Sequence, residues 1–159
     1  MARKIGEISF SNLMAVYEES NQHNGKEKWP EESPALQLLL AEQGFHQYLR
    51  ECFFTTAGAV YAIWQQDGLY VSALRLEPYQ DGLLLEALET VPDGRRKGHA
   101  KALIRSVRSM YPDDKIYAHV SKRNIASLRT HESCGFRKIL DHAVFIDGSV
   151  MQSFVTLVL

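Results

Sequence analysis

The chain has 159 residues, of which 45% are hydrophobic and 23% charged, and its formal net charge at pH 7 is -1. This size and composition fit one globular domain over residues 1–159, with a sizeable core. A nearly neutral chain has no overall attraction for nucleic acid or an anionic membrane, and no apolar run reaches the roughly 18 residues of a membrane span. With 2 cysteines and no signal-peptide pattern, a reducing, cytoplasmic setting is expected.

The first third of the chain predicts two helices joined by a polar loop. Apolar side chains in residues 10–17 recur at i, i+3, i+4 and i+7, the spacing of one helix face. Ser33–Pro34 is a good start for a second helix, because serine caps helices and proline suits their first position. Gly44 is a candidate break in that helix. The polar segment 21–34 is expected to be a loop, and "KIGEIS" (4–9) is a candidate short strand.

Two Asp-Gly pairs mark the turns of a three-stranded antiparallel meander. They are Asp67–Gly68 and Asp81–Gly82, and they separate strand-like runs that begin after Ala57 and end at Val91. Both residue types tolerate positive φ, which tight hairpin turns require.

The apolar spacing changes to that of a helix after Pro92. This pattern covers residues 100–111, Pro112 ends it, and Lys115–Val120 then reads as a strand. Strand, helix and strand with short links predict a parallel βαβ unit. The segment "RRKGHA" (95–100) therefore lies at a strand-to-helix turn, where free N–H groups and the helix dipole favour an anion such as phosphate. A solvated basic turn without a ligand is the alternative.

The segment "VPDGRRKGHAKALI" resembles the acyl-CoA loop of the GNAT superfamily of N-acyltransferases. The signature of that loop, Gln/Arg-x-x-Gly-x-Gly/Ala, is met by Arg95, Gly98 and Ala100. A second block, "VSKRNIASLRTHESCGF", resembles the family's next motif, in which Asn124 suits the N-cap of a helix and Gly135 its end.

The resemblance covers roughly residues 57–159, and it implies both fold and cosubstrate. The implied fold is mixed α/β, a mainly antiparallel sheet with one parallel βαβ crossover, flanked by helices and closed by a C-terminal hairpin. The implied activity moves an acetyl group from acetyl-CoA to a primary amine of a small molecule or peptide by direct attack, without a metal. The cofactor-binding residues that the resemblance implies are Leu88, Thr90, Val91, Arg95, Arg96, Lys97, Gly98, His99, Ala100, Lys101 and Asn124.

Two glutamates on the strand before the loop are candidates for the general base that such a reaction needs. Simple alternation puts Glu86 and Glu89 on opposite faces, with Glu86 on the face of Leu88 and Thr90. Several enzymes of the family carry an acidic residue near this point, so Glu86 is the predicted base and Glu89 the second choice. His119 in the following strand is a third candidate, and a structural role is open for each of the three.

The family often places a tyrosine, the acid that protonates the leaving thiolate, seven residues after the capping asparagine. Here that position is His131, which is either a proton donor near neutral pH or a packed helix residue. Arg75 is a charge within an apolar strand, and it either grips an acidic acceptor or points to water.

Two other classes of function stay open at this point. One is a non-catalytic CoA-binding module that regulates a partner, and the other is a structural domain whose basic turn binds an adventitious anion. The final strand, "SFVTLVL" (153–159), is a candidate for pairing across a homodimer.

Overall fold

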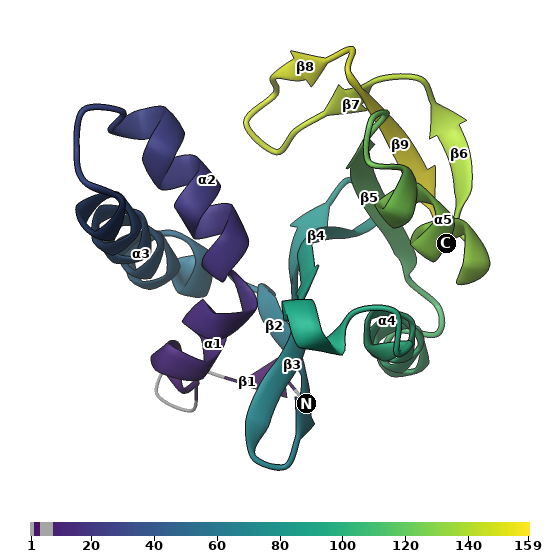
Figure 1. Ribbon diagram of the computed structural model, residues 1–159. Coiled ribbons are helices and arrows are strands. Elements are labelled where there is room, and N and C mark those ends of the chain that lie inside the picture. Colours follow the sequence, from purple (N-terminus) through teal and green to yellow (C-terminus); the bar gives the residue numbers. More distant parts are fainter. Residues whose placement is uncertain (1, 4–7) are drawn as a thin grey trace.

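The structure is a computed structural model, and it describes residues 2–3 and 8–159. Within these residues a seven-stranded sheet has the order β1-β2-β3-β4-β5-β9-β6, with β7 and β8 as a separate small hairpin (Figure 1). The strands are β1 (Ala2–Arg3), β2 (Val60–Gln66), β3 (Leu69–Tyr79), β4 (Gly82–Thr90), β5 (Lys115–Ser121), β6 (Arg137–Leu140), β7 (Ala143–Val144), β8 (Val150–Met151) and β9 (Phe154–Val158). The helices are α1 (Phe10–Val16), α2 (Glu18–Lys28), α3 (Pro34–Glu51), α4 (His99–Met110) and α5 (Ile125–Ser133).

The predicted fold class is confirmed, because the sheet is antiparallel except where β4 pairs with β5 through the crossover helix α4. The meander of β2, β3 and β4 is confirmed as well. At its first turn Asp67 and Gly68 have φ of 50° and 80°, as a tight hairpin requires. The second turn lies one residue earlier than predicted, since Tyr79 pairs with Gly82 across it.

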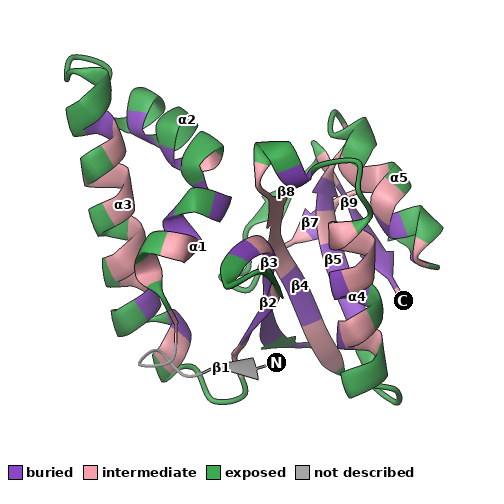
Figure 2. Cartoon of the chain, turned by 60° about the horizontal axis from the view of Figure 1, so that its bottom comes forward, coloured by how far each residue is buried: buried purple, intermediate pink, exposed green. Residues whose placement is uncertain are grey.

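The sheet separates two hydrophobic clusters. One joins Leu74 and Leu76 of β3 to Leu103, Ile104 and other apolar residues of α4. The other lies between the sheet and the N-terminal helices, and it includes Leu13, Tyr17, Phe53 and Tyr61. Figure 2 shows the buried residues concentrated along the central strands, whereas α2 and much of α3 are exposed.

The prediction of a loop over residues 21–34 is wrong for its first part. Residues 18–28 form the helix α2, whose buried residues are only Asn21 and Gly25. With so few buried positions the helix has no apolar periodicity that a sequence could display. Its packing needs glycine, because a Cβ on Gly25 would lie 2.4 Å from the carbonyl oxygen of Gln37 in α3. The suggested break at Gly44 is also absent, since α3 is continuous through this residue.

The C-terminal segment folds differently from a simple hairpin. Its Asp-Gly turn joins the short strands β7 and β8, while β9 inserts between β5 and β6. The sequence prediction missed β6, which is the edge of the sheet. Because both sides of β9 are already paired, the prediction that this strand pairs across a dimer is wrong.

Two further results concern the N-terminal candidate strand and the expected absence of a membrane span. The candidate strand "KIGEIS" lies largely outside the described residues, which omit 4–7. Among the described residues, no helix has the length and apolarity needed to cross a membrane.

The two parallel strands β4 and β5 stay paired over only part of their length. Their ladder joins residues 82–85 of β4 to residues 115–118 of β5 and then ends. Gly82 allows the strands to approach at the start, because a Cβ there would lie 2.1 Å from the carbonyl oxygen of Lys115. Beyond Leu85 the strands diverge, and this gap in the sheet positions the candidate site.

Candidate active site

A β-bulge interrupts β4 where it leaves its partner β5. Glu86 pairs with Arg75 of β3, whereas Glu89 pairs with Ala73, so Ala87 and Leu88 together face a single residue of β3. Ala87 has a φ of 49°, which is rare for a residue other than glycine. The bulge lies next to the gap between the strands, as bulges beside active sites often do.

The backbone of β4 beyond the bulge is directed into the gap at alternate residues. The N–H group of Val91 donates to the carbonyl oxygen of Val71 in β3, at 2.9 Å, and the hydroxyl of Ser72 donates to the carbonyl oxygen of Glu89. Because backbone groups alternate in direction along a strand, those of Leu88 and Thr90 face the gap. The backbone groups of Leu88 and the N–H group of Thr90 are therefore open to an extended ligand there, whereas the carbonyl oxygen of Thr90 accepts from Arg95 Nε.

Hydroxyl and guanidinium groups from outside β4 hold the bulge in place. The phenol of Tyr17, in the turn between α1 and α2, donates to the carbonyl oxygen of Ala87 at 2.7 Å. The hydroxyl of Ser72 lies 3.0 Å from that of Thr90, and Arg95 Nε donates to the carbonyl oxygen of Thr90 at 3.2 Å. The shape of this strand end thus depends on Tyr17 near the N-terminus as well as on Ser72 and Arg95 from the middle of the chain.

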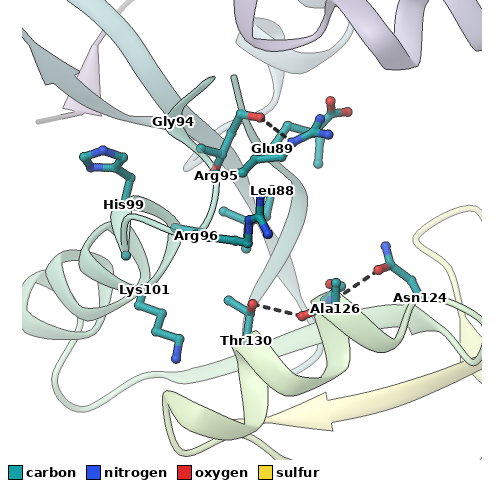
Figure 3. A pocket seen from close by; sticks show the side chains of 15 residues that line it. Leu88, Glu89, Gly94, Arg95, Arg96, His99, Lys101, Asn124, Ala126 and Thr130 are labelled. Atoms are coloured by element: carbon teal, nitrogen blue, oxygen red, sulfur yellow. Dashed lines mark hydrogen bonds between the residues drawn. The ribbon is translucent and has the colours of Figure 1, made fainter. Parts of the chain in front are cut away.

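The gap opens into a cleft of about 820 Å³ between β4, the N-terminus of α4 and the N-terminus of α5 (Figure 3). Gly98 caps α4 with a φ of 87°, and a Cβ built on it would meet nothing within 4 Å. Within the described chain α4 has no side-chain cap and no acidic residue in its first turn. The N–H groups of residues 99–101 are therefore available to an anion, and the helix dipole favours one.

The turn before α4 supplies further positive potential. Arg96 and Gly98 both have left-handed backbone conformations, with φ of 61° and 87°. Turns that contain left-handed residues direct successive N–H groups toward one side. The side chains of Arg96, His99 and Lys101 line the cleft. Arg95 also lines it, but its guanidinium pairs with Glu19 of α2 at 2.5 Å and so ties the turn to that helix.

Asn124 lies on the opposite wall of the cleft. Its side-chain oxygen accepts from the N–H group of Ser127, at 3.0 Å, so it caps α5 as predicted. It also lines the cleft together with Ala126, Ser127 and Thr130 of the same helix. The structural and the functional interpretation of Asn124 are thus compatible, and a second helix N-terminus faces the same cleft.

Two residues that the resemblance implied as cofactor contacts lie elsewhere. Val91 directs its N–H group to β3 and packs its side chain against the cluster under the N-terminal helices. Lys97 is exposed on the turn and is not part of the cleft wall. The other implied residues, namely Leu88, Thr90, Arg95, Arg96, Gly98, His99, Ala100, Lys101 and Asn124, line the cleft.

The bulge changes which glutamate reaches the cleft. Residues opposite each other in an antiparallel pair point to the same face, and Glu86 and Glu89 lie opposite Arg75 and Ala73, which share a face. The prediction that Glu86 and Glu89 lie on opposite faces is therefore wrong. The prediction that Glu86 shares a face with Leu88 and Thr90 is wrong as well. The reason is physical: one extra residue in a strand reverses the alternation beyond it.

Glu89 lies where the cleft meets a second hollow. This hollow, of about 320 Å³, is on the side of the N-terminal helices and shares Ala87 and Glu89 with the cleft. Burial raises the pKa of Glu89, an effect that Ser20 and Arg95 partly offset. Glu86 lines neither space among those described, and its carboxylate lies 4.0 Å from the guanidinium of Arg75. Burial and the neighbouring Glu77 raise the pKa of Glu86 to about 7.

His131 lies in the core, and only 2% of its surface is exposed. Its Nδ1 is 2.8 Å from the carbonyl oxygen of Ser127, so that nitrogen carries the proton, and its ring packs edge-on against Phe136. Nε2 is then an unprotonated nitrogen, buried without a partner, and burial lowers the pKa of the ring. The prediction of His131 as the acid is wrong for this arrangement, because the ring does not reach the cleft and its one proton is donated to the carbonyl oxygen of Ser127.

His119 has a structural role in its surroundings. Its Nε2 is 3.0 Å from the carbonyl oxygen of Val144, and its Nδ1 is 3.2 Å from the hydroxyl of Thr156. The first contact attaches the β7–β8 hairpin to the sheet, and the second joins β5 to β9 within it. No cluster of histidine, cysteine and carboxylate side chains that could hold a metal occurs among the described residues.

The sequence analysis assigned no individual residue of the N-terminal helices to the site. Tyr17 holds the bulge, and Ser20, Asn21, Asn24 and Tyr48 line the second hollow. The one signal was the helix pattern of residues 10–17, which identified Tyr17 as a core residue without indicating its hydroxyl.

The sequence profile of the acetyltransferase (GNAT) family matches residues 13–136 of this chain. The chain therefore belongs to the GNAT acetyltransferase family, whose members use acetyl-CoA. A comparison with curated proteins gave no match.

Solved structures share the fold across nearly the whole chain. One is a PaiA N-acetyltransferase from Thermoplasma acidophilum in complex with coenzyme A, at 12% identity and a TM-score of 0.63, covering 99% of this chain and 96% of that one. Another is a ribosomal-protein-alanine N-acetyltransferase from Brucella melitensis, at 15% identity and a TM-score of 0.61, covering 100% and 98%. A third is an IAA acetyltransferase from Bacillus cereus, at 14% identity and a TM-score of 0.60, covering 100% and 96%.

Proposed function

We propose that this protein is an N-acetyltransferase that transfers the acetyl group of acetyl-CoA to a primary amine. The observation that carries the proposal is the gap between β4 and β5. It is flanked by two helix N-termini and adjoins a second hollow through the carboxylate of Glu89. A long anionic ligand suits the cleft, and a smaller molecule suits the hollow.

The cleft fits coenzyme A in its chemistry. The N–H groups of residues 99–101 would hold the pyrophosphate, and Arg96 and Lys101 would supply counter-charge. The backbone groups of Leu88 and the N–H group of Thr90 would pair with the pantetheine arm and donate to the thioester carbonyl. The thioester supplies an activated carbonyl carbon that an amine can attack.

The residues between the cleft and the hollow provide for proton transfer. An amine with a free pKa near 10.4 is protonated at neutral pH and must lose a proton before it attacks. Glu89 is the carboxylate that lines both spaces, so it is our proposed base, directly or through a water molecule. Glu89 takes the proton that the ammonium group of the acceptor loses before attack. The nitrogen–carbon bond then forms as the carbon–sulfur bond breaks, and the nitrogen, which keeps one hydrogen in the amide, releases the other to water.

The departing thiolate has no protein acid at His131. A thiol with a pKa of about 8.5 is a tolerable leaving group without one, and water in the open cleft can protonate it later. The burial of His131 also keeps a second candidate function in view, namely a module that binds coenzyme A without turnover.

The experiment is a calorimetric titration of the purified protein with acetyl-CoA, repeated with Gly98→Glu and Gly68→Glu. Both glycines have positive φ and open space around the missing Cβ, so the two variants bear the same backbone strain. We expect a dissociation constant on the order of micromolar, lost in Gly98→Glu and kept in Gly68→Glu.

The outcomes separate the proposals. Absence of binding to the unaltered protein, or equal losses in the two variants, would reject the cleft as the acetyl-CoA site. Binding without release of free thiol in the presence of any amine from a broad panel would reject the enzyme and support the binding module.

A further inference from the structure

The second hollow carries one charge of each sign. Its volume of about 320 Å³ is the size of a site for a small molecule. Arg75 and Glu89 are its charged residues, and Glu89 is at the edge shared with the acetyl-CoA cleft. The walls around them include the rings of Phe45 and Tyr48 and the amide of Asn24.

Arg75 points into the protein and not to water. Its side chain is only 15% exposed, and its guanidinium carbon lies 5.0 Å from the centre of the Tyr48 ring and 5.7 Å from that of Phe53. Aromatic faces attract a cation at this distance, but they do not accept its N–H groups in the plane of the guanidinium.

The hydrogen-bonding capacity of Arg75 is largely unused. Its Nε is buried without a partner among the described residues, and its Nη2 lies 4.0 Å from the nearest carboxylate, that of Glu86, which is too far for a hydrogen bond. A buried guanidinium with free donors is costly unless an anion completes it. This arrangement therefore favours an anionic group of a ligand in the hollow.

The two charges have a spacing suited to one small molecule. Glu89 lies opposite Ala73, which is two residues from Arg75 on the same face of β3. Two residues along a strand span about 7 Å. An amine near Glu89 and a carboxylate near Arg75 can thus belong to the same compound, with its hydrocarbon part against Phe45 and Tyr48.

We propose that the acceptor is a small amino acid-like compound, a primary amine whose carboxylate is bound by Arg75 while its amine faces Glu89 and the cleft. This inference rests on the proposed acetyltransferase function and names its substrate class. A diamine or polyamine is disfavoured, because Arg75 would repel a second positive charge within the hollow. A folded protein is too large for the hollow itself. The N-terminal segment of a protein is smaller, and the hexapeptide in the experiment below represents it.

The first experiment uses the unaltered protein with acetyl-CoA and matched acceptors. L-leucine and L-phenylalanine are compared with their amides, and spermidine and an alanine-initiated hexapeptide complete the set. Release of free thiol gives kcat/KM, expressed per unprotonated amine, because amidation lowers the pKa of the amino group. We expect the acids to exceed their amides about 10- to 100-fold, the usual effect of a charge-assisted hydrogen bond.

The second experiment uses Arg75→Gln and Arg75→Lys, after acetyl-CoA titration has verified that each variant keeps its cleft. In Arg75→Gln we expect the preference for acid over amide to fall to within about threefold, chiefly through KM. Arg75→Lys should retain part of it, since the charge remains while the planar donor pair is lost.

The results that overturn the inference are distinct from those that overturn the acetyltransferase. If acetyl-CoA binds and spermidine, the hexapeptide or an amide is the better acceptor, the assigned substrate class is wrong. The same holds if acetyl-CoA binds and no carboxylate-bearing amine reacts. Failure of acetyl-CoA to bind would instead remove the proposed function.

Discussion

The hydrogen bond from Tyr17 to Ala87 offers the sharpest test of how the fold shapes the site. Tyr17 is 3% exposed, and its hydroxyl reaches across 70 positions of sequence to the bulge in β4. Tyr17→Phe removes the hydroxyl and leaves the ring, so it opens no cavity of consequence. The loss is that of one net hydrogen bond to a half-buried carbonyl, and it amounts to about 1 to 2 kcal/mol of unfolding free energy.

A matched control exists in the same protein. The hydroxyl of Tyr79, which is 8% exposed, donates to the carbonyl oxygen of Val144 at 2.6 Å, away from the cleft. Tyr79→Phe removes a bond of the same kind, together with one that the side-chain amide of Gln80 donates to this hydroxyl at 3.1 Å, so urea unfolding should show a loss of stability at least as large. For a domain of this size, such a loss lowers the melting temperature by roughly 3 to 6 °C.

The two variants should differ in what happens at the cleft. Without Tyr17 to hold its carbonyl, Ala87 can relax from its φ of 49°, and the neighbouring N–H groups lose their alignment. We expect acetyl-CoA affinity, measured by calorimetry with no acceptor present, to fall about tenfold in Tyr17→Phe and to stay unchanged in Tyr79→Phe. Equal affinities in the two variants would show that the bulge does not depend on this bond.

Three other predictions concern packing, pH and rate. Gly82→Ala places a methyl group against the carbonyl oxygen of Lys115 and should lower the unfolding free energy by about 3 kcal/mol, whereas Gly44→Ala, in open space on a helix, should raise it by about 0.5 to 1 kcal/mol in urea titrations. Glu86 has a pKa of about 7 in the folded state against 4.5 for a free side chain. Between pH 4.5 and 7 the folded protein therefore keeps the proton of Glu86, whereas the unfolded chain loses it. This difference makes the unfolding free energy fall as pH rises through that range. Urea titrations across that range should show Glu86→Gln gaining stability relative to the unaltered protein, and an opposite trend would contradict the assignment. Because burial raises the pKa of Glu89, kcat/KM for an acceptor should rise with pH, and the midpoint of this rise should lie above pH 4.5. Glu89→Gln should remove this rise and lower kcat by roughly 100-fold or more. A variant of normal rate would rule Glu89 out as the base.

Local chemistry explains the parts of the fold that were predictable. The Asp67–Gly68 hairpin, the serine and asparagine caps and the apolar stripe of α4 all depend on neighbouring residues in the chain. The uncapped start of α4, where we propose that an anion binds, was predictable for the same reason, since it needs only a strand-to-helix turn with Gly98 at its end.

Tertiary contacts decided the features that the predictions missed. The helix α2 has almost no buried face, and it is held by its close approach to α3 at Gly25. His131 occupies the position of a familiar acid in the motif, yet the packing against Phe136 turns its ring into the core. Neither outcome has a local pattern that a reader of the sequence could detect.

The sequence by itself determined the antiparallel meander, the crossover helix with its parallel strand and the basic strand-to-helix turn, and hence the family of the protein. The tertiary structure alone decided which carboxylate reaches the cleft, because that depends on a single extra residue in β4. A strand alternates with a period of two, so one bulged residue brings Glu89 to the same face as Glu86 and beside the cleft. The bulge is in turn set by the pairing of β3 with β4 and by a hydroxyl from the N-terminal helices, contacts that form only when distant segments meet.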